Sequence, residues 1–177
     1  MGKVSKVSLM SRSMKKITMD DLAYLAEVAD EDLNDFISRH PRYFGLKANR
    51  FCVALCQGAA LHYLNGTNGV KDLDVWTFYA HDGRNPSYPY RTRRERLVER
   101  GTFAKPARKI DLLGRTLDAS KGEDPVRAVQ RYVATHASAS AKALAKKAVV
   151  AILPARLRGT IIWPVSAQEQ GLGPRRR

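Results

Sequence analysis

Two aspartates, Asp72 and Asp74, are the residues with the clearest potential for chemistry. Alternate residues of a strand point to the same face, so on a strand these two carboxylates lie together and repel each other. Leu73 and Val75 then point to the opposite, buried face, which places the acids on a rigid element. Mg²⁺ takes oxygen ligands and keeps several waters, so one or two fixed carboxylates plus substrate phosphates complete its shell. The pair therefore indicates a site for a divalent metal.

A third carboxylate, Asp111, lies at the start of a second apolar segment, residues 109–113. Three carboxylates can hold two Mg²⁺ ions about 3.5–4 Å apart, one activating an attacking oxygen and one neutralising a leaving group. In that arrangement Asp111 is the base nearest to an incoming hydroxyl. The alternative is that Asp72 and Asp74 are ordinary surface acids on an edge strand.

Hydrophobic spacing predicts the elements that position these acids. Thr18 and Asp21 form a capping pair for an amphipathic helix that ends near His40. The apolar run 51–56 predicts a buried strand, and Gly58 opens a short helix that stops at Asn65-Gly66. Residues 71–79 and 109–113 predict two further strands.

The remaining elements are predicted from local signals. The long basic connection predicts a short helix over residues 93–98. Asp124-Pro125 predicts a helix start, and apolar spacing predicts another helix through Leu144, Ala148 and Ile152. The last apolar segment of the sequence is residues 160–163.

The length of 177 residues suits one compact domain. We expect a flexible basic leader over 1–17, one domain over 18–165 and a flexible basic tail over 166–177. Apolar runs are too short to cross a membrane, so we expect a cytoplasmic protein without membrane partners. Cys52 and Cys56 lie in an apolar run without a zinc-type His spacing, which favours buried free thiols.

The order of these features resembles the nucleotidyltransferase superfamily of the DNA polymerase beta type. The family pattern is a glycine that opens a helix, an Asp-x-Asp on the next strand and a third acid on a later strand. Here these are Gln57-Gly58-Ala59, Asp72-Leu73-Asp74 and Asp111, and the resemblance covers residues 51–117. It implies an α/β (α+β) fold with a small mixed sheet flanked by helices.

The resemblance also implies roles for other residues. Gln57, Gly58 and Ala59 would bind the nucleotide, although Ala59 stands where the family has Gly or Ser and offers only its backbone N–H. Lys142 and Lys146, four apart on a helix face, would reach the triphosphate. The acceptor-binding residues would be a group of arginines, namely Arg91, Arg93, Arg94, Arg96 and Arg100.

A formal charge of +14 favours acidic partners over basic ones. Between residues 84 and 109, nine Lys and Arg stand against two Glu. The expected activity is transfer of a nucleoside monophosphate from an NTP such as ATP to a hydroxyl of an RNA or protein acceptor, with Mg²⁺ or Mn²⁺ as cofactor. The alternatives are an inactive version of the fold, a basic nucleic-acid-binding module and, last, an Asp-x-Asp glycosyltransferase. Whether a partner protein completes the site stays open.

Overall fold

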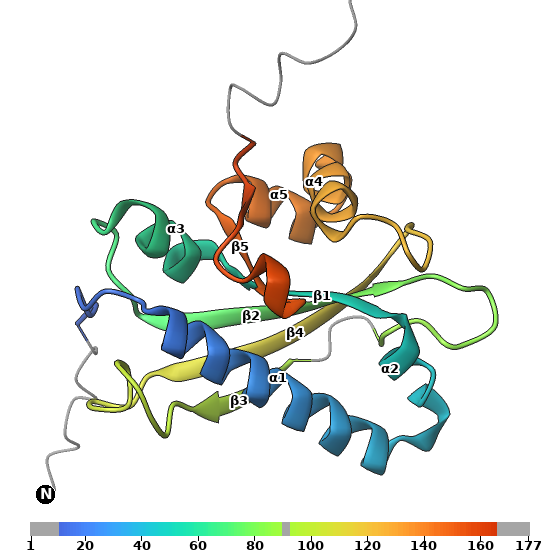
Figure 1. Ribbon diagram of the computed structural model, residues 1–177, viewed down its shortest axis with the longest axis horizontal. Coiled ribbons are helices and arrows are strands. Elements are labelled where there is room, and N and C mark those ends of the chain that lie inside the picture. Colours follow the sequence, from blue (N-terminus) through green and yellow to red (C-terminus); the bar gives the residue numbers. More distant parts are fainter. Residues whose placement is uncertain (1–10, 90–92, 166–177) are drawn as a thin grey trace, which may run out of the picture.

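The computed structural model describes residues 11–89 and 93–165 and has a six-stranded mixed sheet between two layers of helices (Figure 1). This confirms the predicted α/β class. The helices are α1 (Met19–Arg39), α2 (Leu46–Asn49), α3 (Gln57–Asn65), α4 (Pro125–Thr135) and α5 (Ala139–Ala145). The strands are β1 (Arg50–Cys56), β2 (Asp72–Ala80), β3 (Arg94–Leu97), β4 (Lys109–Leu117), β5 (Val149–Leu153) and β6 (Ile161–Trp163).

The strand order is β3-β4-β2-β1-β5-β6. The β2–β4 pair is parallel, and the other four pairs are antiparallel. Since β2 lies between β1 and β4, the Asp-x-Asp segment begins a central strand and not an edge strand. The edge-strand alternative for Asp72 and Asp74 is therefore wrong.

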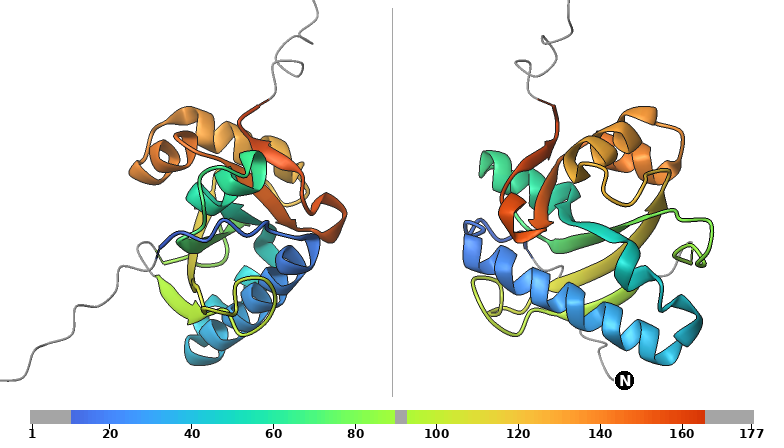
Figure 2. Two further views of the ribbon diagram at one scale, coloured as in Figure 1. Left: turned by 90° about the vertical axis from the view of Figure 1, so that its left-hand side faces the viewer. Right: turned by 45° about the vertical axis from the view of Figure 1, so that its right-hand side comes forward.

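The two faces of the sheet are covered by different helices (Figure 2). One face packs on α1 and α3 through apolar residues that include Leu25, Ala60, Val75 and Ile110. The other face packs on α4 and α5 through residues that include Cys52, Cys56, Trp76, Phe78, Val129 and Leu144. Both cysteines are buried free thiols, as predicted.

The first helix forms as its sequence predicts. Thr18 accepts a hydrogen bond from the backbone N–H of Asp21, and the Asp21 carboxylate accepts one from the backbone N–H of Thr18. This capping box satisfies donors that the first turn would otherwise leave unpaired. Leu22, Leu25 and Leu33 then follow at helical spacing and are buried against the sheet.

One predicted helix is wrong, and a second ends earlier than predicted. Residues 94–97 form the edge strand β3, whose side chains alternate between the two faces, because this segment pairs with β4. The helix predicted through Leu144, Ala148 and Ile152 ends at Ala145. Residues 149–153 form the buried strand β5, because this segment pairs with β1 and, at Val149 and Val150, with β6. A continuous apolar run fits a strand buried on both faces as well as it fits a buried helix.

The segment 11–17 lies against the domain. Ser13 pairs with Val70 through two backbone hydrogen bonds, and Ile17 is buried. His62 accepts a hydrogen bond from the Gly69 N–H at Nδ1, so its Nε2 carries the proton donated to the Lys15 carbonyl. The rest of the predicted leader, 1–10, and the predicted tail, 166–177, lie outside the described residues. No helix within 11–89 and 93–165 has the length and apolar character needed to cross a membrane.

Candidate functional site

The three predicted acids lie near the starts of two neighbouring inner strands, β2 and β4. In the parallel β2–β4 pair, Asp74 stands directly opposite Asp111, and Asp72 precedes Asp74 by one pleat on the same face. Each strand packs its intervening residues into the core, since Leu73, Ile110 and Leu112 are buried. The fold therefore brings Asp72, Asp74 and Asp111 together on a rigid support.

Asp111 is the most buried of the three acids, and two cations contact it. Arg93, which precedes β3, donates a hydrogen bond from Nη2 to Asp111 Oδ2. Lys109 Nζ lies 3.3 Å from Asp111 Oδ1, and this oxygen accepts no hydrogen bond from the described residues. Lys109 also donates to Glu95 over 3.2 Å. Basic side chains therefore hydrogen-bond one oxygen of Asp111 and only approach the other.

Asp74 experiences burial and like charge together. Its pKa is raised to about 6, first because burial penalises the carboxylate and then because Asp111 and Asp72 repel it. Arg93 and Lys147 act in the opposite direction. Three acids whose charges oppose one another are typical of a site that binds a cation or handles a proton.

The turn from β1 into α3 aims a helix N-terminus at these acids. Gln57 has a φ of 58°, a left-handed backbone conformation that residues other than glycine rarely adopt. Its backbone N–H donates to the carbonyl of Ala148, which fixes the turn. The Gly58 carbonyl accepts a hydrogen bond from Asn68 Nδ2 over 3.0 Å. The first N–H groups of α3 are thereby presented next to β2.

A small hollow of about 110 Å³ joins this helix end to the acids. It is lined by Gly58, Ala59, Asp72 and Asp74 and by three cations, namely Arg12, Lys71 and Lys147. A side-chain carbon added to Gly58 would lie 3.8 Å from Lys147 Nζ and 4.0 Å from Arg12 Nη1. Paired carboxylates beside converging cations can hold a metal and a phosphate side by side.

The sequence analysis missed these three cations. Lys71 is adjacent to Asp72, and this is a signal that could have been used. Lys147 was hidden because the predicted helix continued through Ala148, whereas α5 ends at Ala145. Arg12 carries no sequence signal, since it lies in the predicted leader and reaches the hollow through the pairing of Ser13 with Val70.

Of the predicted nucleotide-binding lysines, Lys142 lies on α5 and Lys146 just after it. Both are exposed, and neither lines the hollow. Gln57, Gly58 and Ala59 lie at the start of α3, with Gly58 and Ala59 in the hollow.

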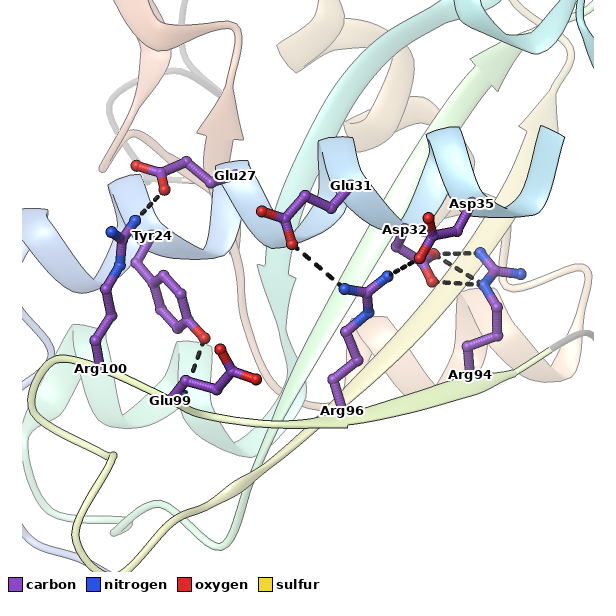
Figure 3. A network of polar contacts seen from close by, with 9 residues as sticks. All are labelled: Tyr24, Glu27, Glu31, Asp32, Asp35, Arg94, Arg96, Glu99 and Arg100. Carbon is purple, nitrogen blue, oxygen red and sulfur yellow. Dashed lines mark hydrogen bonds and ion pairs between the residues drawn. The ribbon is translucent and has the colours of Figure 1, made fainter. Parts of the chain in front are cut away.

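The predicted acceptor-binding arginines divide into two groups. Arg93 contacts Asp111, while Arg94, Arg96 and Arg100 face α1 and form ion pairs there (Figure 3). Their partners are Asp32 for Arg94, Glu31 and Asp35 for Arg96, and Glu27 for Arg100. Arg91 lies outside the described residues. The α1 acids thus neutralise three of the predicted arginines.

Within residues 11–89 and 93–165, no group of three or more His, Cys, Asp or Glu side chains is arranged to hold a metal ion. The chemistry of the donors nevertheless fits Mg²⁺: Asp111 Oδ1 is buried and accepts no hydrogen bond from the described part of the chain, and the Asp74 carboxylate is repelled by its neighbours. The Arg93 contact is the feature that has to change for Asp111 to join such a site.

A larger hollow of about 570 Å³ lies at the other end of β4. Its lining includes His81, Tyr88, Gly114 and Thr116, and none of the predicted site residues. Tyr88 fills the space beside Gly114, where an added side-chain carbon would come within 2.7 Å of its ring. The larger volume carries no cluster of acids, so we place the candidate site at the smaller hollow.

Comparisons of the chain with protein-family models, with curated proteins and with solved structures found no match.

Proposed function

We propose that the protein is a metal-dependent nucleotidyltransferase that moves a nucleoside monophosphate from an NTP to a hydroxyl, with release of pyrophosphate. The observation that carries this proposal is the direct pairing of Asp74 with Asp111 across β2 and β4, beside the α3 N-terminus. The resemblance to the nucleotidyltransferase superfamily stays part of the proposal. An acidic acceptor such as RNA fits the charge of +14.

In the proposed reaction the acceptor oxygen attacks the α-phosphorus of the NTP. A new P–O bond forms, the bond between the α-phosphorus and the bridging oxygen breaks, and pyrophosphate leaves with the electron pair. Asp111 takes the proton of the acceptor hydroxyl. Mg²⁺ bound by Asp72, Asp74 and Asp111 would neutralise charge on the phosphates.

The chain's own residues have distinct tasks in this scheme. The backbone N–H groups of Gly58 and Ala59 and the side chains of Lys71, Lys147 and Arg12 bind the phosphates of the NTP. Asp74 stays close to Asp111 because its strand is hydrogen-bonded on both sides. Rigid placement of this kind is what positions reacting groups.

The test is a calorimetric titration of the protein with each of the four NTPs in Mg²⁺, followed by a pyrophosphate-release assay with an RNA oligonucleotide. We expect binding and release with the wild type, and loss of both in Asp74→Asn, because that change removes a metal ligand and little packing. Asp118→Asn, an exposed acid outside the small hollow, is the matched control. Full activity of Asp74→Asn would overturn the proposal.

Two observations favour a second candidate, an inactive fold that binds nucleic acid. Arg93 and Lys109 already compensate Asp111, and Ala59 lacks a hydroxyl. Such a module would bind RNA without Mg²⁺, with an affinity that falls steeply with salt and is unaffected by Asp74→Asn. Titration of the wild type and of Asp74→Asn with an RNA oligonucleotide, in Mg²⁺ and in EDTA, separates the two candidates.

A further inference from the structure

Arg12 is the cation of the small hollow that comes from segment 11–17, ahead of the first helix. Its guanidinium lines the hollow, and Nη1 donates a hydrogen bond to the Asn68 carbonyl over 3.4 Å. The other two cations, Lys71 and Lys147, lie within two residues of β2 and β5, whose pairing fixes their backbones. Segment 11–17 contains no strand of the sheet, so separate contacts must hold Arg12 at the hollow.

His62 connects this segment to the loop between α3 and β2. It lies on α3, is 3% exposed and uses both nitrogens of its ring. Nδ1 accepts a hydrogen bond from the Gly69 N–H over 3.0 Å, and Nε2 donates to the Lys15 carbonyl over 3.0 Å. Next to these contacts, Ser13 and Val70 exchange two backbone hydrogen bonds. One imidazole therefore holds both the segment and the loop on which it lies.

Gly69 allows the backbone of the segment to approach this loop closely. A side-chain carbon added to Gly69 would lie 2.8 Å from Arg12 Cβ and 3.0 Å from Met14 Sδ. Two carbons cannot approach so closely, so the backbone of Arg12 would have to move. Gly66, at the start of the same loop, has the same φ of 69°, and no atom of the described residues lies within 4 Å of a carbon added there.

We propose that His62 and Gly69 are positioning residues of the phosphate site, which hold the backbone of segment 11–17 so that the Arg12 guanidinium faces the small hollow. This inference rests on the proposed function. Arg12 is the residue that contacts phosphate, and a guanidinium binds phosphate oxygens through a fork of donors whose geometry is fixed. His62 and Gly69 act only through Arg12, so a change at either cannot remove more affinity than Arg12 supplies.

The experiment is a calorimetric titration with inorganic tripolyphosphate in Mg²⁺ on the wild type, His62→Phe, Arg12→Gln and the double variant. Phenylalanine keeps an aromatic ring and removes both hydrogen bonds of the imidazole. We expect Arg12→Gln to weaken binding about tenfold, as for a lost charge-assisted contact, and His62→Phe to weaken it about three- to tenfold. The double variant should bind as weakly as Arg12→Gln alone, because the two residues act as one unit.

Two glycine variants repeat the test with the imidazole intact. Gly69→Ala and Gly66→Ala add the same side chain at the same φ, so both carry a similar backbone strain. We expect Gly69→Ala to weaken tripolyphosphate binding about three- to tenfold and Gly66→Ala to leave it unchanged. Hydrogen exchange adds a readout without ligand: the amides of Ser13 and Val70 should exchange faster in His62→Phe and Gly69→Ala than in the wild type.

The outcomes separate this inference from the proposed function. Additive losses in the double variant would overturn the inference, because His62 would then act on the hollow through α3 and not through Arg12. Unchanged binding by His62→Phe and Gly69→Ala would overturn it too, as would equal losses in the two glycine variants. In these cases the wild type still binds NTP and tripolyphosphate, so the proposed function stands. If the wild type binds neither, the proposed function fails, and the positioning role fails with it.

Discussion

At the scale of single residues, burial and the charges of two neighbouring acids disfavour the ionised form of the Asp74 carboxyl group. Its pKa is about 6 in the folded chain against 3.8 for an ordinary aspartate. The folded state therefore binds this proton more tightly than the unfolded state, and stability is lost as the pH rises from about 4 through 6. We expect Asp74→Asn to be more stable than the wild type at pH 7.5 by on the order of 1 kcal/mol.

This gain should be measured by urea denaturation in EDTA at pH 3.5 and at pH 7.5. The difference between variant and wild type should shrink at the lower pH, where both states carry the proton. Asp118→Asn, at an exposed acid, should show no comparable gain. A destabilised Asp74→Asn at pH 7.5 would show that hydrogen bonds of the carboxylate outweigh repulsion.

Lys147 is the lysine that the structure brings to the α3 N-terminus. Lys147→Met keeps a long chain and removes the charge, so we expect NTP and tripolyphosphate binding to weaken by about tenfold, as for a lost charge-assisted contact. Lys142→Met is the matched control, because Lys142 is an exposed lysine outside the hollow. A larger loss from Lys142→Met would instead favour the lysine that the sequence predicts.

At the scale of elements, the attachment of β3 to α1 depends on ion pairs (Figure 3). Arg94 Nε donates to both carboxylate oxygens of Asp32 over 2.7 and 2.9 Å, and Asp32 is buried. Arg94→Gln leaves that acid buried without its partner, so we expect a loss of about 3 kcal/mol of unfolding free energy. Arg96→Gln, whose partners Glu31 and Asp35 are exposed, should cost less than about 1 kcal/mol.

Urea denaturation of both variants measures this difference. The Arg94 effect should persist in 0.5 M NaCl, because buried charges are weakly screened, and the Arg96 effect should vanish. Equal effects would mean that the Asp32 carboxylate reaches water once β3 is released.

The sequence predicts the elements whose signals are local. The Thr18–Asp21 capping box, the α3 stop at Gly66 and the Asp72–Asp74 strand are set by residues close together in the chain. The helix predicted over 93–98 is wrong because a partner strand, β4, decides the conformation of this basic segment. The helix predicted through Leu144, Ala148 and Ile152 ends at Ala145 for the same reason, since pairing of residues 149–153 with β1 outweighs apolar spacing.

The candidate site divides along the same line. The order of the three acids is visible in the sequence, and their convergence follows once β2 and β4 pair in parallel. Arg12 and Lys147 come from segments remote in sequence, so only the packing of the chain places them at the hollow. Arg93 contacts Asp111 because β3 pairs with β4. The residues around Arg93 in the sequence do not indicate this pairing.

At the scale of the whole molecule, only some of the basic side chains behind the charge of +14 are free of acidic partners and can contact a polyanion directly. The acids of α1 pair with Arg94, Arg96 and Arg100. The lysines around the end of α5, namely Lys142, Lys146 and Lys147, are exposed, and Lys147 lies near Asp74. A nucleic-acid acceptor should therefore meet the α5 lysines before the β3 arginines.

This order of contact can be measured as a salt dependence. For single-stranded RNA, each neutralised phosphate contributes about 0.7 to the slope of log K against log salt concentration. Lys142→Gln combined with Lys146→Gln should lower the slope by about 1.4. Arg96→Gln combined with Arg100→Gln should leave it nearly unchanged, because each arginine would have to leave an acid of α1 before it contacts a phosphate. A larger change from the arginine pair would show that RNA displaces the α1 acids from these arginines. The RNA would then bind the arginines that the sequence predicts as acceptor-binding residues.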